Sequence, residues 1–384
     1  MDFSIPAELS QDRDRFKGFL DEHLVPHLSV WYQEGAIPRS FFDTLGKGGW
    51  LGFEVKQGLM EKLSALRGAM VSEQIATISP GVAVAVLAHV DLGLTGLWLF
   101  GSQELKQKYA NAAQGKILLC LGNTESGAGS DVASISMEAK QVRGGWRLNG
   151  AKAYVTNGAI SDLTIVTAIS DPQARRNNRL SMFLVDLTAK GVKTTKLNKR
   201  GWIPSDLTRV QLTDVFVPDD HLMGDRGRGL QQVLTIFTNS RVIITGLTLG
   251  TALGGFEMAL GHAAKREIFG KKIVQFQAKA FEIADFYARI EAARLMLWKA
   301  CWALDNGRDF RVESSIAKYL AVMIAREVTT WAADLHGAAS IIFEHPIHKF
   351  PMDAWASSLG EGTQDVQKLI IFREVMKRYG IPYR

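Results

Sequence analysis

The chain has 384 residues, of which 47% are hydrophobic and 22% charged, and its formal net charge at pH 7 is +6. This length exceeds what one ordinary hydrophobic core supports, so two or three subdomains are expected in a globular protein of ordinary composition. The positive charges are spread along the chain without a run of five or six. Because no nucleic-acid-binding module accompanies them either, a nucleic-acid partner is not expected.

Cysteine usage and the N-terminus both favour a soluble cytoplasmic protein. Cys120 and Cys301 stand in apolar surroundings, which indicates buried thiols in a reducing compartment more than a disulfide framework or a metal site. Residues 1–6 lack the basic and apolar regions of a signal peptide.

One stretch, residues 82–100, has enough apolar residues to resemble a membrane span. His89 and Asp91 interrupt it near the middle, and Gly93 and Gly96 follow. We therefore predict a buried helical hairpin here and no membrane segment.

Residues 1–115 are predicted to be helical throughout. The breaker cluster Gly48 to Gly52 precedes the second main helix, and prolines mark further helix boundaries. These prolines are Pro26, Pro38 and Pro80. The apolar residues at helical spacing are Phe16, Phe19, Leu20 and Leu24, then Met60, Leu63, Leu66, Met70 and Ile75.

From residue 116 to 228 the pattern changes to short β-rich runs. Gly144-Gly145 and Asn149-Gly150 are predicted to be hairpin turns. No helices separate the runs, which favours an antiparallel barrel or sandwich over a parallel sheet. The predicted strands cover residues 117–121, 146–148, 151–155, 163–169, 180–185, 192–197 and 210–217.

The helical period returns after residue 228. Long amphipathic runs begin near Leu230 and continue over residues 283–304, 316–335 and 367–379, which predicts a four-helix bundle. The expected fold is therefore α+β and multidomain. It has an N-terminal helical domain (1–115), a middle β domain (116–228) and a C-terminal four-helix bundle (229–384).

The loop of residues 123–131, here called the glycine–serine loop, follows the first predicted strand. A Gly- and Ser-rich loop leaves backbone N–H groups free for a ligand, and Thr124 and Ser130 add hydroxyls. It suits a polar ligand, either anionic or heteroaromatic, although a surface turn of small residues has the same composition. Because no helix follows in a βαβ unit, Gly127 and Gly129 do not belong to a dinucleotide-binding fingerprint of the Rossmann type.

Other catalytic motifs are missing from the sequence, namely GxxxxGK[ST], HExxH, CxxC and GxSxG. His345 and His348 have a spacing that could serve a metal. Pro346 between them argues against a regular helix presenting both, so no metal site is expected.

Three further segments could carry chemistry. Arg266, followed by Phe269 and Gln277, could bind a diphosphate bidentately, although a solvated helix end has the same composition. The small-residue break that begins at Asp334 would let backbone approach a ligand closely. Glu361 stands between two glycines, as a carboxylate projecting into a cleft would, although a lone glutamate is more often a surface residue.

Taken in order, these segments resemble the acyl-CoA dehydrogenase family over nearly the whole chain. Residues 124–131 resemble its TEPxAGSD signature, with Ser126 in place of proline, and residues 152–158 resemble KxWITNG, with Tyr154 in place of tryptophan. Residues 266–277 look like RxxFGxxxxxxQ, and residues 360–363 look like YEGT, with Gly360 in place of tyrosine.

The resemblance implies FAD bound between the β domain and the bundle. Thr156 would donate near flavin N5 or O4, and Arg266 would hold the diphosphate and adenosine part from a neighbouring subunit of a homotetramer or homodimer. Asp334 stands where the family usually has glutamine, and Ala338 where it has a second glycine. The implied FAD-binding residues are Leu121, Asn123, Thr124, Gly129, Ser130, Tyr154, Thr156, Arg266, Phe269, Gln277, Asp334, Gly337, Thr363 and Asp365.

The implied reaction is α,β-dehydrogenation of an acyl thioester, in fatty-acid or secondary metabolism. Glu361 would remove the α-proton while the β-hydrogen leaves as hydride to flavin N5, with Thr156 as the second catalytic residue. Some relatives place the base before an arginine on the first bundle helix, where this chain has Ser240 before Arg241. The implied substrate-binding residues are Ser130, Arg241, Gly360 and Glu361.

Two departures from the family concern the substrate. Gly360 leaves space beside the reacting carbons, which favours a branched, cyclic or otherwise wide acyl group. Residues 54–58 replace the usual proline- and glycine-rich loop, which reshapes the entrance for the thioester carrier.

Several alternatives stay open from the sequence. The thioester carrier is coenzyme A or an acyl-carrier protein of a natural-product pathway, and the electron acceptor is an electron-transfer flavoprotein or oxygen. A flavin oxidase or monooxygenase on the same fold is another alternative. A non-catalytic binding protein is a third, although such a protein would need neither Glu361 nor Thr156.

Overall fold

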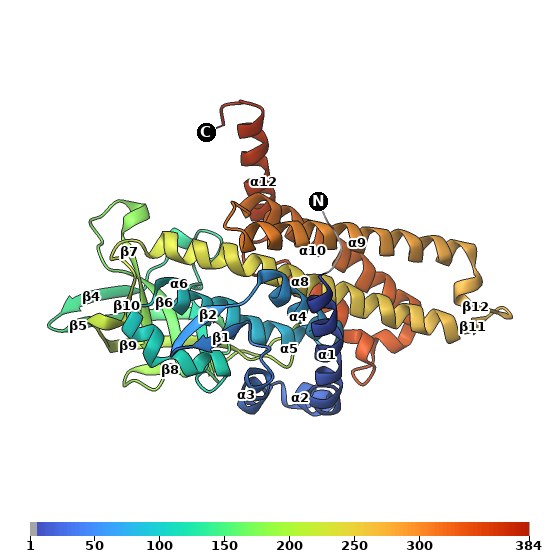
Figure 1. Ribbon diagram of the computed structural model, residues 1–384, viewed down its shortest axis with the longest axis horizontal. Coiled ribbons are helices and arrows are strands. Elements are labelled where there is room, and N and C mark those ends of the chain that lie inside the picture. The colour runs from blue at the N-terminus through green and yellow to red at the C-terminus, as the bar shows by residue number, and fades with distance from the viewer. Residues whose placement is uncertain (1–5, 384) are drawn as a thin grey trace.

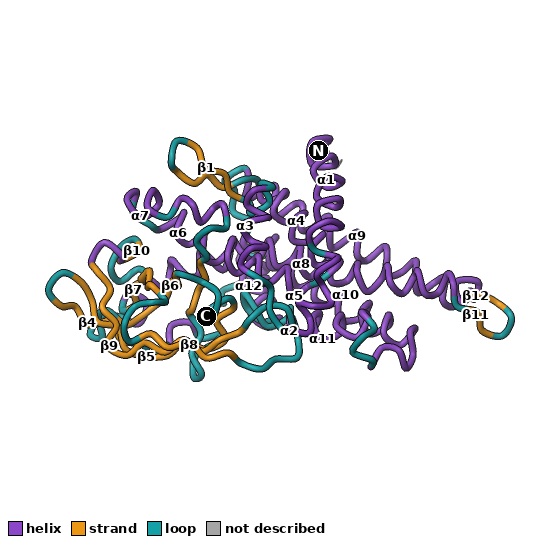
Figure 2. Tube along the Cα trace, turned by 90° about the horizontal axis from the view of Figure 1, so that it is seen from below, coloured by secondary structure: helices purple, strands orange, loops and turns teal. Residues whose placement is uncertain are grey.

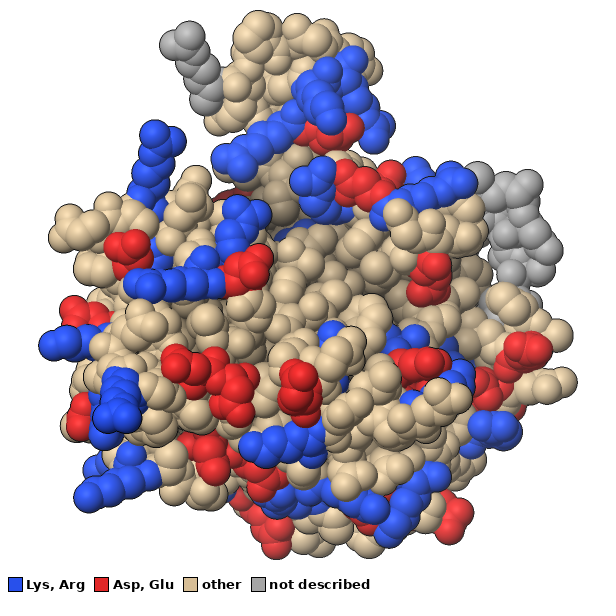
Figure 3. All heavy atoms as spheres, turned by 60° about the vertical axis from the view of Figure 1, so that its left-hand side comes forward, with Lys and Arg blue, Asp and Glu red and all other residues tan. Residues whose placement is uncertain are grey.

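The computed structural model describes residues 6–383. The predicted absence of a signal peptide concerns mainly residues 1–5, which lie outside this range. The molecule is elongated, with a β-sheet towards one end, helices towards the other, and the long helix α8 running between them (Figure 1). On the face shown in Figure 3, acidic and basic side chains are interspersed.

Short helices form most of the N-terminal part, as predicted. Pro38 precedes α3, Pro80 is the first residue of α5, and Pro26 lies in a 3₁₀ turn, so all three mark helix boundaries. Phe16 and Phe42 are fully buried in the core between these helices. The helices are α1 (Ala7–His23), α2 (Leu28–Glu34), α3 (Arg39–Lys47), α4 (Ala65–Ile78), α5 (Pro80–Leu87), α6 (Thr95–Phe100) and α7 (Gln103–Lys108).

The prediction of helix throughout residues 1–115 is wrong between residues 53 and 62. This segment is an antiparallel hairpin of β1 (Phe53–Lys56) and β2 (Leu59–Lys62). Gln57 and Gly58 have φ values of 50° and 80°, so both adopt the left-handed conformation that a two-residue hairpin turn requires. Met60 fitted a helical spacing by coincidence, because it is buried as part of a strand.

Residues 80–100 are buried, as predicted, but they do not form a hairpin. They make one continuous helix in which a π-helical segment, Ala88–Leu94, joins α5 to α6. A Cβ atom on Gly93 would lie 2.5 Å from Leu119 Cβ, and one on Gly96 would lie 2.6 Å from Ile165 Cδ1. These glycines therefore permit close contact with the sheet and do not form a turn.

The middle part is an eight-stranded mixed sheet in the order β10-β7-β6-β4-β5-β9-β8, with β3 also paired to β6. Most pairs are antiparallel, as predicted, but β3 and β4 each pair with β6 in parallel. The strands are β3 (Leu119–Gly122), β4 (Glu138–Val142), β5 (Gly145–Thr156), β6 (Leu163–Ile169), β7 (Leu180–Asp186), β8 (Val192–Lys196), β9 (Leu207–Pro218) and β10 (Leu222–Met223).

One predicted turn in the sheet is wrong. Gly144-Gly145 lies at the β4–β5 connection as expected, whereas Asn149-Gly150 lies inside β5. The register against β9 shifts between Leu148 and Gly150, which marks a β-bulge. Gly150 has φ 146°, and a Cβ there would lie 2.8 Å from Met137 Cα, so the glycine serves the bulge and a close contact.

Four long helices of the C-terminal part occur where the sequence predicts them. The short helix α11 was not predicted, and α12 projects from the body of the molecule (Figure 1). Figure 2 shows the two-residue strands of the hairpin β11–β12 at the end of the molecule opposite the large sheet. The elements are α8 (Gly229–Lys265), β11 (Glu267–Ile268), β12 (Lys271–Lys272), α9 (Gln277–Asp305), α10 (Arg311–His336), α11 (Lys349–Ala356) and α12 (Gln364–Arg378).

Glycines bring α8 into close contact with α4. Gly246, Gly250 and Gly254 recur at a spacing of four residues, which places them on one face of the helix. A Cβ on Gly246 would lie 2.6 Å from Ala69 O, and one on Gly250 or Gly254 would clash with a backbone carbonyl one or two turns further along α4. Here the two helices touch backbone to backbone.

Two helical stretches are long and apolar enough to cross a membrane, namely Pro80–Phe100 and Gly229–Lys265. In each, 83% of the most apolar window is buried inside the protein. A core helix that is apolar all round has the same character.

The contact between α4 and α8 can be tested with two alanine substitutions in the same helix. We expect Gly250→Ala to lower the free energy of unfolding by roughly 1–3 kcal/mol, because the methyl group forces the helices apart. Gly261→Ala is the control, since a Cβ there meets no atom within 4 Å. It should raise stability by up to about 1 kcal/mol through helix propensity. Urea unfolding measures both, and equal stabilities of the two variants would contradict the close contact.

Candidate active site

The glycine–serine loop begins where β3 ends and lies beside the end of β5. The backbone N–H of Ala153 donates to Thr124 O at 2.8 Å, which ties the two segments together. A Cβ on Gly127 or Gly129 would meet no atom within 4 Å, and Ser130 is exposed. The loop therefore presents an open face that a ligand can approach.

A buried ion pair supports this loop from beneath. Lys152 is fully buried, and its Nζ donates to Glu125 Oε1 at 2.8 Å and to Asn123 O at 3.1 Å. Glu125 also accepts from the backbone N–H groups of Ser136 and Met137. Burial lowers the pKa of Lys152 to about 8, against the opposing charge of Glu125. Sequence reasoning passed over this pair, although both residues stand in the motifs it singled out.

Two of the predicted ligand residues have buried side chains. Asn123 is 3% exposed, and its Oδ1 accepts a hydrogen bond from Thr167 Oγ1 at 2.7 Å. Leu121 is buried within β3. The side-chain oxygen and the backbone carbonyl of Asn123 are therefore both hydrogen-bonded within the protein.

Tyr154 and Thr156 stand at the end of β5, next to the loop. Tyr154 is 63% exposed and has φ 57°, and Asn157 has φ 64°. The side chain of Asn157 donates to Ala85 O at 2.7 Å, which helps to hold this unusual backbone. Strained backbone that the surrounding structure maintains is common at functional sites.

Together the loop and the β5 terminus form one candidate ligand-binding surface. It offers the hydroxyls of Thr124, Ser130 and Thr156, free space over two glycines and an exposed aromatic ring. This chemistry fits a planar heteroaromatic ligand such as a flavin, as the resemblance implied.

Glu361 lies in the loop between α11 and α12. It has φ 48° and stands between Gly360 and Gly362, whose φ is 93°. Its Oε2 atom is buried and receives no hydrogen bond from the described residues. A buried carboxylate oxygen without a partner is costly, so this atom is a candidate for a functional role.

Lys318 on α10 holds the backbone on both sides of Glu361. The side chain is fully buried, and Nζ donates to Gly360 O and, at 2.6 Å, to Gly362 O. The lysine therefore maintains the left-handed conformation of the residue between them. The sequence offered no signal for this role beyond a lysine on an otherwise apolar helix face.

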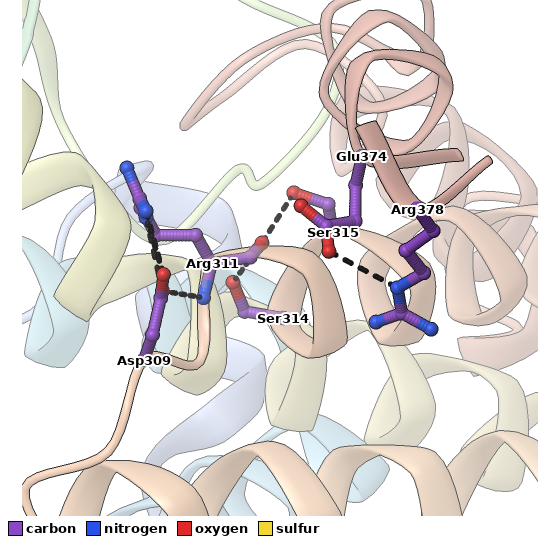
Figure 4. Close-up of polar contacts among 6 residues, drawn as sticks. All are labelled: Asp309, Arg311, Ser314, Ser315, Glu374 and Arg378. Carbon is purple, nitrogen blue, oxygen red and sulfur yellow. Dashed lines mark hydrogen bonds and ion pairs between the residues drawn. The ribbon is translucent and has the colours of Figure 1, made fainter. Parts of the chain in front are cut away.

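Arg241 is the second buried cation near Glu361. It is 5% exposed, and Nη1 donates to Ser315 Oγ at 3.4 Å, while Ser315 Oγ donates to Arg311 O at 2.8 Å. Figure 4 shows this start of α10, with Arg311 paired to Asp309. Ser240, at the position of the alternative base, is buried and donates to a backbone carbonyl.

The charges around Glu361 influence one another. Burial raises the pKa of Glu361, while the positive charges of Lys318 and Arg241 oppose the rise. Burial also lowers the pKa of Lys318 to about 7 and that of Arg241 to about 10. A carboxyl group whose pKa is moved upward in this way suits proton transfer near neutral pH.

Thr363 and Asp365 follow the base at the start of α12. Thr363 precedes the helix without a side-chain capping bond, and Asp365 is exposed and pairs with Lys368 at 3.3 Å. A contact of either side chain with a cofactor stays a prediction.

The predicted diphosphate and adenosine residues lie elsewhere, around a cavity of about 1580 Å³. Arg266, Phe269, Asp334 and Gly337 line it, and Gln277 begins α9 between two lining residues. Phe269 is 95% exposed with φ 48°. This cavity adjoins the hairpin β11–β12, which Figures 1 and 2 place far from the sheet. One chain therefore does not bring these residues to the glycine–serine loop.

Histidines gather near the same cavity. His345 Nδ1 accepts from the backbone of Ile347 at 3.3 Å, and His348 Nδ1 is bonded to His345 O at 2.8 Å. Within residues 6–383, no group of three or more His, Cys, Asp or Glu side chains is arranged to hold a metal ion.

Known proteins match the whole length of this architecture. Three family models match in succession, described as acyl-CoA dehydrogenase, N-terminal domain (residues 6–115), middle domain (120–215) and C-terminal domain (227–376).

Individual relatives also align over nearly the full chain. Probable acyl-CoA dehydrogenase YngJ of Bacillus subtilis is 30% identical over 98% of this chain and 100% of its own. Subunit CarC of the caffeyl-CoA reductase-Etf complex of Acetobacterium woodii is 29% identical over 90% of this chain and 92% of its own. The structure of PigA with FAD and proline superposes with a TM-score of 0.93 at 27% identity, covering 98% of this chain and 100% of that one.

The support that Lys152 gives the loop can be tested by unfolding. Lys152→Met should lower the free energy of unfolding by roughly 3–5 kcal/mol, because it leaves Glu125 buried without its cation. Lys152→Met/Glu125→Gln should recover part of that loss. Lys140→Met, on the exposed side of β4, is the matched control and should stay within about 0.5 kcal/mol of wild type. If Lys152→Met lowers the free energy of unfolding no more than Lys140→Met does, the ion pair does not support the loop.

Proposed function

The chain belongs to the acyl-CoA dehydrogenase family, and from this premise we propose that Glu361 is the base that removes the α-proton of its acyl thioester substrate. The protein is a flavin-dependent oxidoreductase that acts on a CH–CH group, and its cofactor is FAD. The observation that carries the assignment of the base is the buried, unpartnered Oε2 of Glu361 in a loop clamped by Lys318.

The glycine–serine loop and the end of β5 are the part of this chain that would hold the flavin ring. Thr124, Ser130 and Thr156 would donate hydrogen bonds to it, and Tyr154 would lie against it. When bound, FAD supplies the acceptor for the hydride that leaves the β-carbon.

Removal of the α-proton is the step of the reaction that residues of this chain would carry out. A thioester α-proton is far less acidic than a carboxyl group. A base with a raised pKa therefore reduces the pKa difference that opposes proton transfer. Burial raises the pKa of Glu361 in this direction. Lys318 positions the base by fixing the carbonyls on either side of it, and a backbone N–H would stabilise the developing enolate oxygen.

We propose that a second copy of the chain completes each FAD site. Arg266 and Phe269 stand near the end of the molecule opposite the sheet, and the nearly complete exposure of Phe269 leaves its ring free to contact another subunit. Arg266, Phe269 and Gln277 would then hold the diphosphate and adenosine part of the cofactor bound by the partner. The arrangement requires a homodimer at least, and we propose a homodimer or homotetramer.

We also propose partners and a location. CarC belongs to a complex with Etf, which supports an electron-transfer flavoprotein as the acceptor for this protein, and coenzyme A is the proposed thioester carrier. The two buried, free cysteines support a cytoplasmic location. A wide acyl group beside Gly360 stays a prediction, as does the division of the chain at residues 115 and 228.

Removing the base tests the proposal directly. In the absence of oxygen, wild-type protein should lose its visible flavin absorbance when mixed with acyl-CoA substrates. Glu361→Gln should slow this bleaching by at least about a thousandfold while FAD stays bound, because the amide cannot take the proton. Glu344→Gln, at an exposed position between α10 and α11, should bleach at the wild-type rate. Unimpaired bleaching by Glu361→Gln would refute the assignment.

The pH dependence of bleaching tests the charges around the base. Only the carboxylate form of Glu361 accepts a proton, so the rate should fall as pH drops through its raised pKa. Below pH 7 Lys318 is charged and holds that pKa down, so Lys318→Met should move the acid limb of the profile to higher pH. Lys318→Arg keeps the charge and should leave the limb in place. Rapid-mixing measurements between about pH 5 and 9 would give the profiles. An acid limb that stays in place or moves to lower pH in Lys318→Met would contradict the effect of Lys318 on the pKa of Glu361.

A further inference from the structure

Another pair of buried charged residues, Lys62 and Asp91, lies in the N-terminal helical part, outside the sequence motifs described above. Both line a small cavity of about 30 Å³ enclosed by the β1–β2 hairpin, α4, the helix of residues 80–100 and α8. Most of the other lining residues are apolar, such as Leu51, Val71 and Ile243, and two serines, Ser64 and Ser72, also line it. The volume is that of about one or two water molecules, so the cavity accepts a small polar group.

Lys62 has hydrogen-bonding capacity left over. Its side chain is 14% exposed, and Nζ donates to Thr95 Oγ1 at 2.9 Å, while the hydroxyl of Thr95 donates to Val90 O at 3.1 Å. An ammonium group has three donors, and this contact uses one of them. Burial lowers the pKa of Lys62, which reflects the cost of keeping the charge here.

Asp91 has hydrogen-bond acceptors left over. It is 4% exposed, and the nearest approach to Lys62, from Nζ to Oδ1, is 4.0 Å, which is too long for a hydrogen bond. Across residues 6–383 no hydrogen bond reaches its carboxylate group. Burial, together with the negative charge of Glu361, raises the pKa of Asp91 to about 7, against the opposing charge of Lys62. The Lys62 ammonium and the Asp91 carboxylate therefore lie near each other without a direct hydrogen bond.

The cavity lies close to the reacting end of the proposed substrate. Ile243 forms part of its wall, and the next residue, Ile244, lies 3.4 Å from where a Cβ on Gly360 would stand. Gly360 precedes the proposed base, and the negative charge of Glu361 contributes to the raised pKa of Asp91. A group in the cavity would therefore belong to the acyl chain and not to its carrier.

We propose that Lys62 and Asp91 bind a hydroxyl group on the acyl chain, so that the preferred substrates are hydroxyacyl thioesters. This inference rests on the proposed dehydrogenation at Glu361. A hydroxyl group can accept from the Lys62 ammonium and donate to the Asp91 carboxylate at once. A carboxylate substituent would be repelled by Asp91 and an ammonium substituent by Lys62, while an alkyl end would leave both charges without partners.

The test compares substrates that differ in one terminal group. Pentanoyl-CoA and hexanoyl-CoA are paired with 5-hydroxypentanoyl-CoA and 6-hydroxyhexanoyl-CoA, and the terminal amino and carboxyl analogues are added. The rate of anaerobic flavin bleaching, measured at several substrate concentrations, gives the limiting reduction rate divided by the dissociation constant for each. In wild-type protein we expect the better hydroxyacyl substrate to exceed its alkyl partner by at least about tenfold, the scale expected for a hydrogen bond to a charged group, and to exceed both charged analogues.

The principal variant is Lys62→Met/Asp91→Leu, which removes both charges and so leaves no unpaired one in the core. It should lose the preference for the hydroxyacyl substrate or reverse it. The matched control is Lys17→Met/Asp21→Leu, the same change at a solvent-exposed pair on α1, and it should keep the wild-type ratio. Asp91→Asn and Thr95→Val are measured in parallel and should reduce the same ratio, so the test does not depend on the folding of one variant.

The outcomes separate this inference from the proposed function. If no acyl thioester bleaches the flavin, the proposed function fails. If alkyl substrates bleach it as well as hydroxyacyl ones, or if a charged analogue is best, only the hydroxyl site fails. An unchanged ratio in the double variant would likewise mean that the pair does not bind the hydroxyl group of the substrate.

Discussion

The contact between α4 and α8 is the constraint on which the rest of the structure depends. Three glycines allow the backbones of these helices to touch, so α8 passes through the core with little room for adjustment. The same helix carries Arg241 towards the base and Ile243 to the wall of the polar cavity, and it ends beside Arg266. Because interiors are close-packed, a shift of α8 would displace all of these positions together.

Buried charge is handled in three different ways in this protein. Lys152 and Glu125 form a close pair whose remaining hydrogen bonds are supplied by the backbone, which makes a rigid support. Lys318 turns its donors to backbone carbonyls and leaves the carboxylate of Glu361 free. Lys62 and Asp91 remain 4.0 Å apart. A buried charged group whose hydrogen bonds are all made within the protein acts as a structural support. A buried charge without a partner is expected only where another group compensates it, so it marks a site for binding or catalysis.

Much of the fold could be predicted from local patterns, and most of the errors concern glycines. The sequence predicts the strands that have a short apolar run and clear turns, β6 among them, and it locates the long helices to within about six residues. The hairpin at residues 53–62 differs from the predicted helix because Met60 fits a helical spacing by coincidence. The bulge at Gly150 differs from the predicted turn because glycine signals both turns and close contacts. Gly93 was misread for the same reason. Only the neighbouring segment shows which of the two applies.

The sequence by itself determined the family, the cofactor and the order of helical and β segments, because motif residues and hydrophobic periodicity are properties of neighbouring positions. Tertiary structure decided which charges are buried and what they face. Lys318 lies beside Glu361, and Lys62 opposes Asp91, only because α10 and the β1–β2 hairpin pack where they do. It also decided that Arg266 lies far from the glycine–serine loop of its own chain, since α8, about 55 Å long at 1.5 Å per residue, runs from the sheet end towards the opposite end.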